Sequence, residues 1–142
     1  MDIAQLRKQL RFAIDAQRRE ASSRRSRLDE ATRQYEKFLG EIAAPVFRLM
    51  ATALTAEGVP FDVMTPSGGV RLTDRARRDD GIGLELDTTA DPPVPVVSVT
   101  RTRGRRVLQH ERPVKPGVMV GALTEEDVVA MLFEELAPWL ER

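Results

Sequence analysis

The only histidine of this 142-residue chain, His110, is the side chain best suited to proton transfer near neutral pH. A nucleophilic site would also need a serine, threonine or cysteine placed where that histidine could activate it. The chain has no cysteine, and His110 stands beside Glu111 with no such partner identifiable from the sequence. We therefore interpret His110 as a sheet-edge or core histidine and predict no catalytic residue.

A group of carboxylates in the middle of the chain could in principle hold a divalent metal: Asp74, Asp79, Asp80, Glu85 and Asp87. An aspartate followed on the next strand by a glutamate is typical of metal-dependent nucleases, which also use a lysine close after the glutamate. Two residues after Glu85 stands Asp87 instead, which cannot supply a positive charge for phosphate. A polar strand face and a mixed-charge loop explain these carboxylates better, so we predict no metal site.

Two glycine-containing segments, Ser67-Gly68-Gly69 and Gly81-Ile82-Gly83, could suggest loops that bind phosphate groups. Neither has the lysine of a Walker motif or the spacing of a dinucleotide-binding motif. We interpret both as turn and strand-entry glycines and predict no cofactor.

Four arginines crowd the tip of a predicted hairpin and could bind a phosphate backbone: Arg101, Arg103, Arg105 and Arg106. Residues 5–27 are also basic by six charges, although the whole chain balances 22 basic and 22 acidic side chains. Against nucleic-acid binding, the chain lacks aromatic residues interleaved with these arginines and has no recognisable helix-turn-helix or zinc motif. The acidic segment 124–142 offers a competing partner for the basic residues, in the same molecule or a neighbour.

The element that dominates the chain is a long N-terminal helix, because the first 57 residues hold one seven-residue apolar register. Fifty-odd helical residues would extend roughly 80 Å, whereas the rest of the chain could form a globule only about 25 Å across. The excess helix must therefore pack against its own fold-back or another chain. The apolar positions of the register are Ile3, Leu10, Ile14, Ala21, Leu28, Ala31, Tyr35, Phe38, Ile42 and Leu49.

Breaks in this helix can be predicted from glycine and proline. Neither residue interrupts residues 1–39, so we favour a continuous helix over an antiparallel helical hairpin that breaks near Ser22–Ser23. Gly40 weakens a helix and Pro45 removes a hydrogen bond, so a kink is predicted between them. The broader apolar face that follows, which includes Leu49, is expected to pack on the core.

After residue 58 the apolar residues alternate with polar ones, a pattern that predicts short strands. The segment Val94–Val114 is predicted to form a hairpin whose turn is centred on Arg103 and Gly104, with Val99 opposite Leu108. Thr124 is predicted to cap a final helix. Its predicted buried face consists of Val128, Val129, Leu132, Phe133, Leu136, Trp139 and Leu140.

The predicted fold is α+β, with a coiled-coil-like N-terminal helix kinked near Gly40–Pro45, an antiparallel meander of about four strands and a C-terminal helix packed on the sheet. Two helices are expected to cover one sheet face, while the other face is polar or meets a partner. The predicted organisation is an extended self-association helix over residues 1–39 and a small α+β domain over residues 40–142.

We therefore predict a non-enzymatic assembly or adaptor protein that forms a homo-oligomer, expected to be a dimer, or binds another protein through its N-terminal helix. Nucleic-acid binding through the Arg101–Arg106 hairpin tip is the alternative, and an enzyme with an unrecognised site is the third hypothesis. The N-terminus lacks the apolar core of a signal peptide and no apolar run reaches the length of a membrane span, so a cytoplasmic location without a membrane partner is expected. Self-association is expected to use Ile3, Leu10, Ile14, Leu28, Tyr35 and Phe38.

Overall fold

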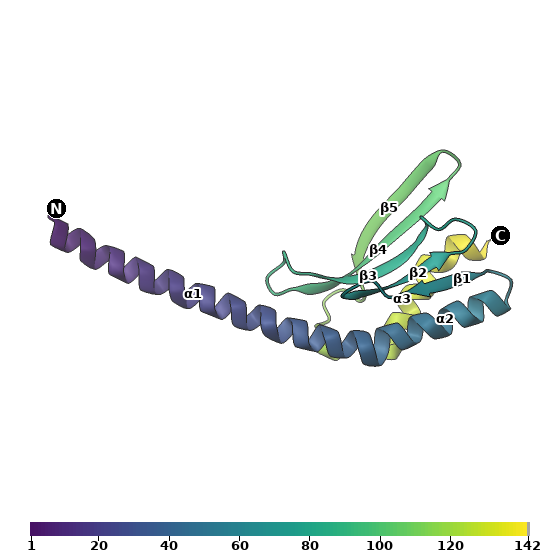
Figure 1. Cartoon of the computed structure of the whole chain (residues 1–142), viewed down its shortest axis with the longest axis horizontal. Coiled ribbons are helices and arrows are strands. Elements are labelled where there is room, and N and C mark those ends of the chain that lie inside the picture. The colour runs from purple at the N-terminus through teal and green to yellow at the C-terminus, as the bar shows by residue number, and fades with distance from the viewer. Residues whose placement is uncertain (142) are drawn as a thin grey trace.

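The computed structural model describes residues 1–141 and joins a long N-terminal helix to a small domain of one sheet and two helices (Figure 1). The predicted α+β class is therefore confirmed. The sheet has five strands rather than about four, because three single strands precede the two strands of the hairpin. The elements in chain order are α1 (Ile3–Phe38), the π-helical turn η1 (Leu39–Ala43), α2 (Ala44–Ala56), β1 (Phe61–Met64), β2 (Gly69–Asp74), β3 (Gly81–Asp87), β4 (Val94–Arg103), β5 (Arg106–Pro113), the 3-10 turn η2 (Val120–Ala122) and α3 (Glu125–Leu140).

Helix α1 runs without a break through Ser22 and Ser23, as predicted, and the alternative of a helical hairpin is wrong. Its start is fixed by a capping box, in which the Asp2 carboxylate accepts a hydrogen bond of 2.9 Å from the Gln5 backbone N–H. The Gln5 side chain in turn accepts from the Asp2 backbone N–H. The two hydrogen bonds of the capping box satisfy backbone N–H groups at the start of α1. No glycine or proline lies within α1, so no local feature ends the helix before Phe38.

The predicted kink between Gly40 and Pro45 takes the form of the π-helical turn η1. The Ala44 backbone N–H donates to the Leu39 carbonyl, five residues back instead of four. Pro45 falls in the first turn of α2, and the widened turn before it accommodates a residue that would clash inside a regular α-helix. Figure 1 shows that the helix axis changes direction at this point.

The sheet is a meander in which β1 to β5 lie in chain order and every neighbouring pair is antiparallel. Helices α2 and α3 lie on the same side of it (Figure 1). The strand residues that point toward the helices form the core together with apolar residues of α2 and α3. These strand residues are Phe61, Val70, Leu72, Ile82, Leu84, Val97 and Val99.

The register of the β4–β5 hairpin differs by two residues from the prediction, since Val99 pairs with His110 rather than with Leu108. The turn residues are Gly104 and Arg105, and Gly104 has a φ of 62°. A turn with a positive φ at its first central residue alone is of type II′, which favours glycine at that position. A shift of two residues returns every side chain to the same face, so the sorting of apolar from polar residues could not detect it.

Helix α3 begins at the predicted capping box, in which the side chain of Thr124 accepts from the Asp127 N–H and that of Asp127 accepts from the Thr124 N–H. Its predicted buried face is wrong at two positions, because the side chains of Phe133 and Leu140 are 57% and 45% exposed. Each step of four residues turns the side-chain direction about 40° beyond one full turn of the helix. The later residues of a four-residue repeat therefore no longer face the core. Met131 occupies the buried face instead.

Candidate assembly surface

The N-terminal part of α1 extends away from the domain (Figure 1). Residues 3–30, which we call the arm, are exposed to solvent apart from Ala21, which is half-buried. Within α1, burial begins at Ala31 and includes only two later residues, Tyr35 and Phe38. Residues 1–141 therefore contain about 40 Å of helix whose sides are open to a partner.

The arm exposes an apolar stripe along one side. The exposed fractions of its side chains are 72% for Ile3, 51% for Leu10, 44% for Ile14 and 37% for Leu28, all four of them predicted association residues. Leu6, 41% exposed, also lies on this stripe, within about 45° of its centre at 100° per residue. The strict seven-residue register missed Leu6 because it passes from Ile3 to position 7, whereas the 3.6-residue period of an α-helix would have found it.

Tyr35 and Phe38 are not available for association, contrary to the prediction. Their side chains are 2% and 3% exposed and belong to the core of the domain, and the Tyr35 hydroxyl donates a 2.8 Å hydrogen bond to the Gly68 carbonyl. The coiled-coil register continues into these residues because an apolar position looks the same in sequence whether its own domain or another chain covers it. The end of α1 therefore belongs to the domain that was expected to begin at residue 40.

An ion pair fixes the root of the arm against the sheet. The Arg27 Nε and Nη2 atoms each lie 3.0 Å from a carboxylate oxygen of Asp91, in the loop between β3 and β4. These hydrogen bonds lower the pKa of the Asp91 carboxyl. Beside this contact lies an apolar groove of about 310 Å³, whose lining includes Ala31, Pro93 and Met119. The arm thus leaves the domain in one defined direction.

The arm is basic as well as amphipathic. Within residues 1–141, ion pairs on this helix involve Arg27, which contacts Glu20 and Asp91, and Arg33, which contacts Glu30. The remaining cations of the arm have no carboxylate within 4.0 Å in the described chain, so their charge is open to a partner. They are Arg7, Lys8, Arg11, Arg18, Arg19, Arg24 and Arg25.

The hairpin tip brings together the four predicted arginines. Arg103 and Arg106 are directly paired across the strands, Arg105 lies in the turn and Arg101 pairs with Leu108 on the same face. None of the four forms an ion pair with a residue between 1 and 141. The tip and the N-terminal end of the arm lie far apart, since they point in different directions from the domain (Figure 1). They therefore form two separate basic surfaces.

His110 and Asp80, two of the residues considered for chemistry, form hydrogen bonds within the fold. His110 Nε2 lies 2.7 Å from a carboxylate oxygen of Glu135, and Arg112 also contacts Glu135, so both residues join β5 to α3. The buried Asp80 accepts hydrogen bonds of 2.8 Å from both the backbone N–H and the hydroxyl of Thr102. The part of the chain that the structure describes contains no cluster of three or more potential metal ligands.

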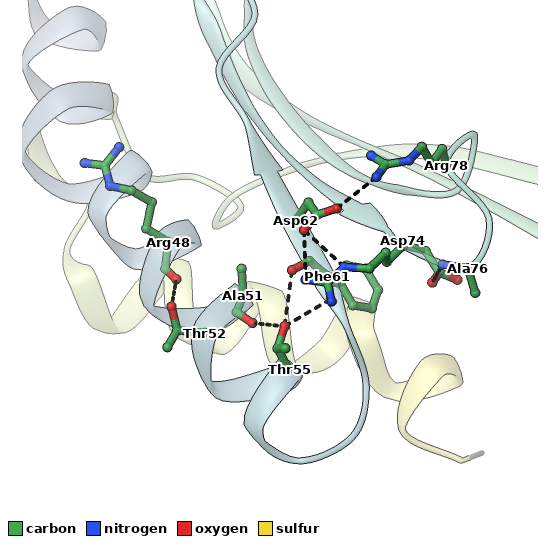
Figure 2. Close-up of polar contacts among 10 residues, drawn as sticks. Arg48, Ala51, Thr52, Thr55, Phe61, Asp62, Asp74, Ala76 and Arg78 are labelled. Carbon is green, nitrogen blue, oxygen red and sulfur yellow. Dashed lines mark hydrogen bonds and ion pairs between the residues drawn. The ribbon is translucent and has the colours of Figure 1, made fainter.

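A cleft of about 450 Å³ between α2 and β1 contains polar side chains, several of which form hydrogen bonds within the fold (Figure 2). The Thr55 hydroxyl donates to the Ala51 carbonyl over 2.8 Å and accepts from the Phe61 N–H over 3.4 Å. Asp62 accepts from Arg75 and Arg78, and these hydrogen bonds and charges lower the pKa of its carboxyl. The Thr55 hydroxyl and the Asp62 carboxylate are thus held by these partners, and no base is hydrogen-bonded to the hydroxyl.

The helical segment Ile3–Ala56 contains one 18-residue stretch that is apolar enough to cross a membrane, with a mean hydropathy of 1.3. The prediction concerned uninterrupted apolar runs, whereas this measure admits up to two charged residues, so the stretch does not contradict it. Within the domain, 39% of the stretch is buried. A core helix of a soluble protein passes the same test, so the stretch gives only weak support for membrane insertion.

Comparisons with protein-family models, with curated proteins and with solved structures find no match to this chain. What the molecule does must therefore be inferred from its own residues. The arm, with its exposed apolar stripe and open positive charge, is the surface on which that inference can rest.

Proposed function

We propose that this protein is a non-enzymatic assembly protein that associates with itself through the arm and presents its sheet-and-helix domain to other proteins. The observation that carries this proposal is the exposed stripe of Ile3, Leu6, Leu10 and Ile14, which nothing in the described chain covers. Helices in proteins gain most of their stability from packing an amphipathic face. A long helix that exposes such a face is therefore best explained by a partner that covers it.

The arm's own domain cannot cover this stripe. The arm continues directly through η1 into α2, so Leu10 is separated from the start of η1 by about 44 Å of helix. A fold-back would require a break, and α1 is continuous from Ile3 to Phe38. A second chain is the simplest way to bury the stripe, and a further copy of this protein is always present.

The molar mass in solution tests this proposal, measured by light scattering during size-exclusion chromatography over a range of concentrations. The wild type is expected to elute as a multiple of 15.9 kDa. The double variant Leu10→Asp and Ile14→Asp is expected to weaken association at least roughly tenfold, because half-exposed apolar side chains are replaced by charges. Thermal unfolding followed by Trp139 fluorescence should be unchanged, since both residues lie outside the core.

Phe12 provides the matched control. Its side chain is 74% exposed and lies on the opposite side of α1 from the stripe. The variant Phe12→Asp adds one negative charge to the arm, half of that in the double variant, and should keep the wild-type mass. A wild type that stays at 15.9 kDa at every concentration, or a double variant that associates like the wild type, would contradict the proposal.

Nucleic-acid binding is the second candidate function, favoured by the open charge of the hairpin tip. Arg103, Arg105 and Arg106 are exposed there and form no ion pair within residues 1–141. Binding through them should produce a gel shift that weakens as salt rises and disappears when all three are changed to Glu. A wild type that gives no shift at low salt would remove this candidate.

A further inference from the structure

A second apolar surface lies on the two helices, where they are open to solvent. Leu49 of α2 and Phe133 of α3 are 65% and 57% exposed, although both were expected to be buried. Together with Met50, Ala53 and Val129 they line a hollow of about 240 Å³ between the two helices. We call this surface, extended along α3 to Leu140, the α2/α3 strip.

The α2/α3 strip continues along one side of α3. At 100° per residue, Val129, Phe133 and Leu140 lie within about 40° of one another around the helix axis. From Val129 to Leu140 the strip is about 16 Å long. A contiguous apolar surface of this kind, rather than scattered single residues, is typical of an interaction site.

The margin of the strip is acidic. Glu125 lines the hollow and Glu126 follows it, and neither forms an ion pair with a described residue. The other carboxylates in the middle of α3 are engaged, since Asp127 contacts Lys115 and both Glu134 and Glu135 contact Arg112. Unpaired negative charge therefore remains at the N-terminal end of α3, where the hollow lies.

The arm has the complementary combination of features. Its apolar stripe from Ile3 to Ile14 is about 16 Å long, the same length as the strip. Arg7 and Arg11 lie along one side of this stripe, and no carboxylate between residues 1 and 141 lies within 4.0 Å of them. An apolar stripe with basic neighbours matches an apolar strip with acidic neighbours in length, polarity and charge.

Contact between two arms matches less well. Each arm is basic by six charges over residues 5–27, so two arms laid side by side would bring like charges together in either direction. The seven-residue register also places Arg7 and Arg24 in the apolar seam. The groove at the root of the arm is apolar too, but its charged lining residue is Lys115, which pairs with Asp127, so the groove has no open negative charge to attract a basic arm.

We propose that the first part of the arm of one copy, residues 3–14, docks on the α2/α3 strip of a second copy. This inference rests on the proposed self-association through the arm and names the surface that receives it. The receiving copy must be a different molecule, because Figure 1 shows that the arm leads away from its own α2 and α3. The contact joins unlike surfaces, so each copy has one arm to donate and one strip to offer.

A mixing experiment tests this pairing. The arm variant carries Leu10→Asp and Ile14→Asp, and the strip variant carries Leu49→Arg and Phe133→Arg. All four side chains are at least 44% exposed, so the substitutions leave the core unchanged. Each variant alone is expected to associate at least roughly tenfold more weakly than the wild type. An equimolar mixture is expected to recover a complex of twice 15.9 kDa, because it contains one intact strip and one intact arm.

Met119→Arg is the matched control for the strip variant. Met119 is 74% exposed and lines the groove at the root of the arm, so this variant adds one positive charge, half of that in the strip variant, to the other apolar hollow. It should associate like the wild type. If it dissociates while the strip variant does not, the groove receives the arm and the inference is overturned.

The outcomes separate this inference from the proposed function. A strip variant that keeps the wild-type mass while the arm variant dissociates would leave self-association intact and overturn the strip as its receiver. Failure of the two variants to complement would also overturn it, whereas a monomeric wild type would overturn both proposals. If the strip variant does not fold, charge-reversal variants test whether the arm docks on the strip. Glu125→Arg with Glu126→Arg should weaken association, and the added changes Arg7→Glu and Arg11→Glu should restore it.

Discussion

Tyr35 allows a test of how the root of the long helix is docked, because it is the only tyrosine in the chain. Its side chain is 2% exposed, and burial, followed by the nearby charge of Glu85, raises its pKa from 10.0 to about 12. The perturbation is a rise in pH. Ultraviolet absorbance of the tyrosinate ion reports Tyr35 alone and should show a midpoint near pH 12 in the folded protein.

The same shift predicts a loss of stability at alkaline pH. An unfolded chain releases the phenol proton near pH 10, whereas the folded chain keeps it to about pH 12. The stability that depends on the neutral phenol is therefore complete below pH 10 and falls as the pH rises from 10 to 12. A difference of two pKa units corresponds to about 3 kcal/mol. Denaturant unfolding, followed by fluorescence of the single tryptophan, Trp139, measures this loss.

The variant Tyr35→Phe isolates the effect from the lysines, which titrate in the same range. It loses the hydrogen bond to the Gly68 carbonyl, which should cost about 1 kcal/mol at neutral pH. The stability that Tyr35→Phe loses between pH 10 and pH 12 should be smaller than the loss in the wild type by about 3 kcal/mol, the contribution of the tyrosine. A tyrosinate midpoint near pH 10, with equal alkaline losses in the two proteins, would refute the docking of α1 through Tyr35.

Two further predictions concern the sheet. A Cβ on Gly81 would lie 2.0 Å from the Leu72 carbonyl oxygen, so Gly81→Ala must displace backbone and should lower the urea midpoint by the equivalent of at least roughly 2 kcal/mol. Gly83→Ala, whose Cβ would come no closer than 3.7 Å to another residue, is the control and should change stability by less than about 1 kcal/mol. Thr102→Val removes the 2.8 Å hydrogen bond from the hydroxyl to the buried Asp80. It should lower stability by about 1.5–3 kcal/mol in the same assay. An unchanged urea midpoint would show that the Thr102 hydroxyl does not stabilise the Asp80 carboxylate.

The sequence was sufficient to predict features that depend on local chemistry. The continuity of α1 follows from the absence of glycine and proline, and the bend follows from Gly40 and Pro45. The α+β class follows from the change of apolar period after residue 58. The hairpin register was wrong because side-chain sorting cannot distinguish registers that differ by two residues, although a requirement for Gly104 at the first position of a type II′ turn would have selected the observed one.

Features that depend on which surface covers which could not be predicted. Tyr35 and Phe38 share the register of Leu10 and Ile14, yet one pair is buried by the domain and the other is exposed. Leu49 also looked like a core residue, since the apolar pattern of a helix does not say how much of that face its neighbours cover. Of the predicted association residues, Ile3, Leu10, Ile14 and Leu28 are exposed whereas Tyr35 and Phe38 are buried, so the limits of the arm had to come from burial.

The π turn determines how the buried sides of α1 and α2 are oriented relative to each other. In an uninterrupted α-helix, at 100° per residue, the buried side of α2 would point about 155° away from the buried side of α1 around the common axis. The extra residue in the π turn rotates α2 back by about 100°, so the two sides differ in direction by only about 55° and meet the same core. One added residue thus turns the buried side of α2 toward that of α1 within the continuous helical segment Ile3–Ala56. The direction of the stripe on the arm is therefore set by the number of residues between Leu28 and Tyr35, and a single insertion there would turn the stripe by about 100° relative to the domain.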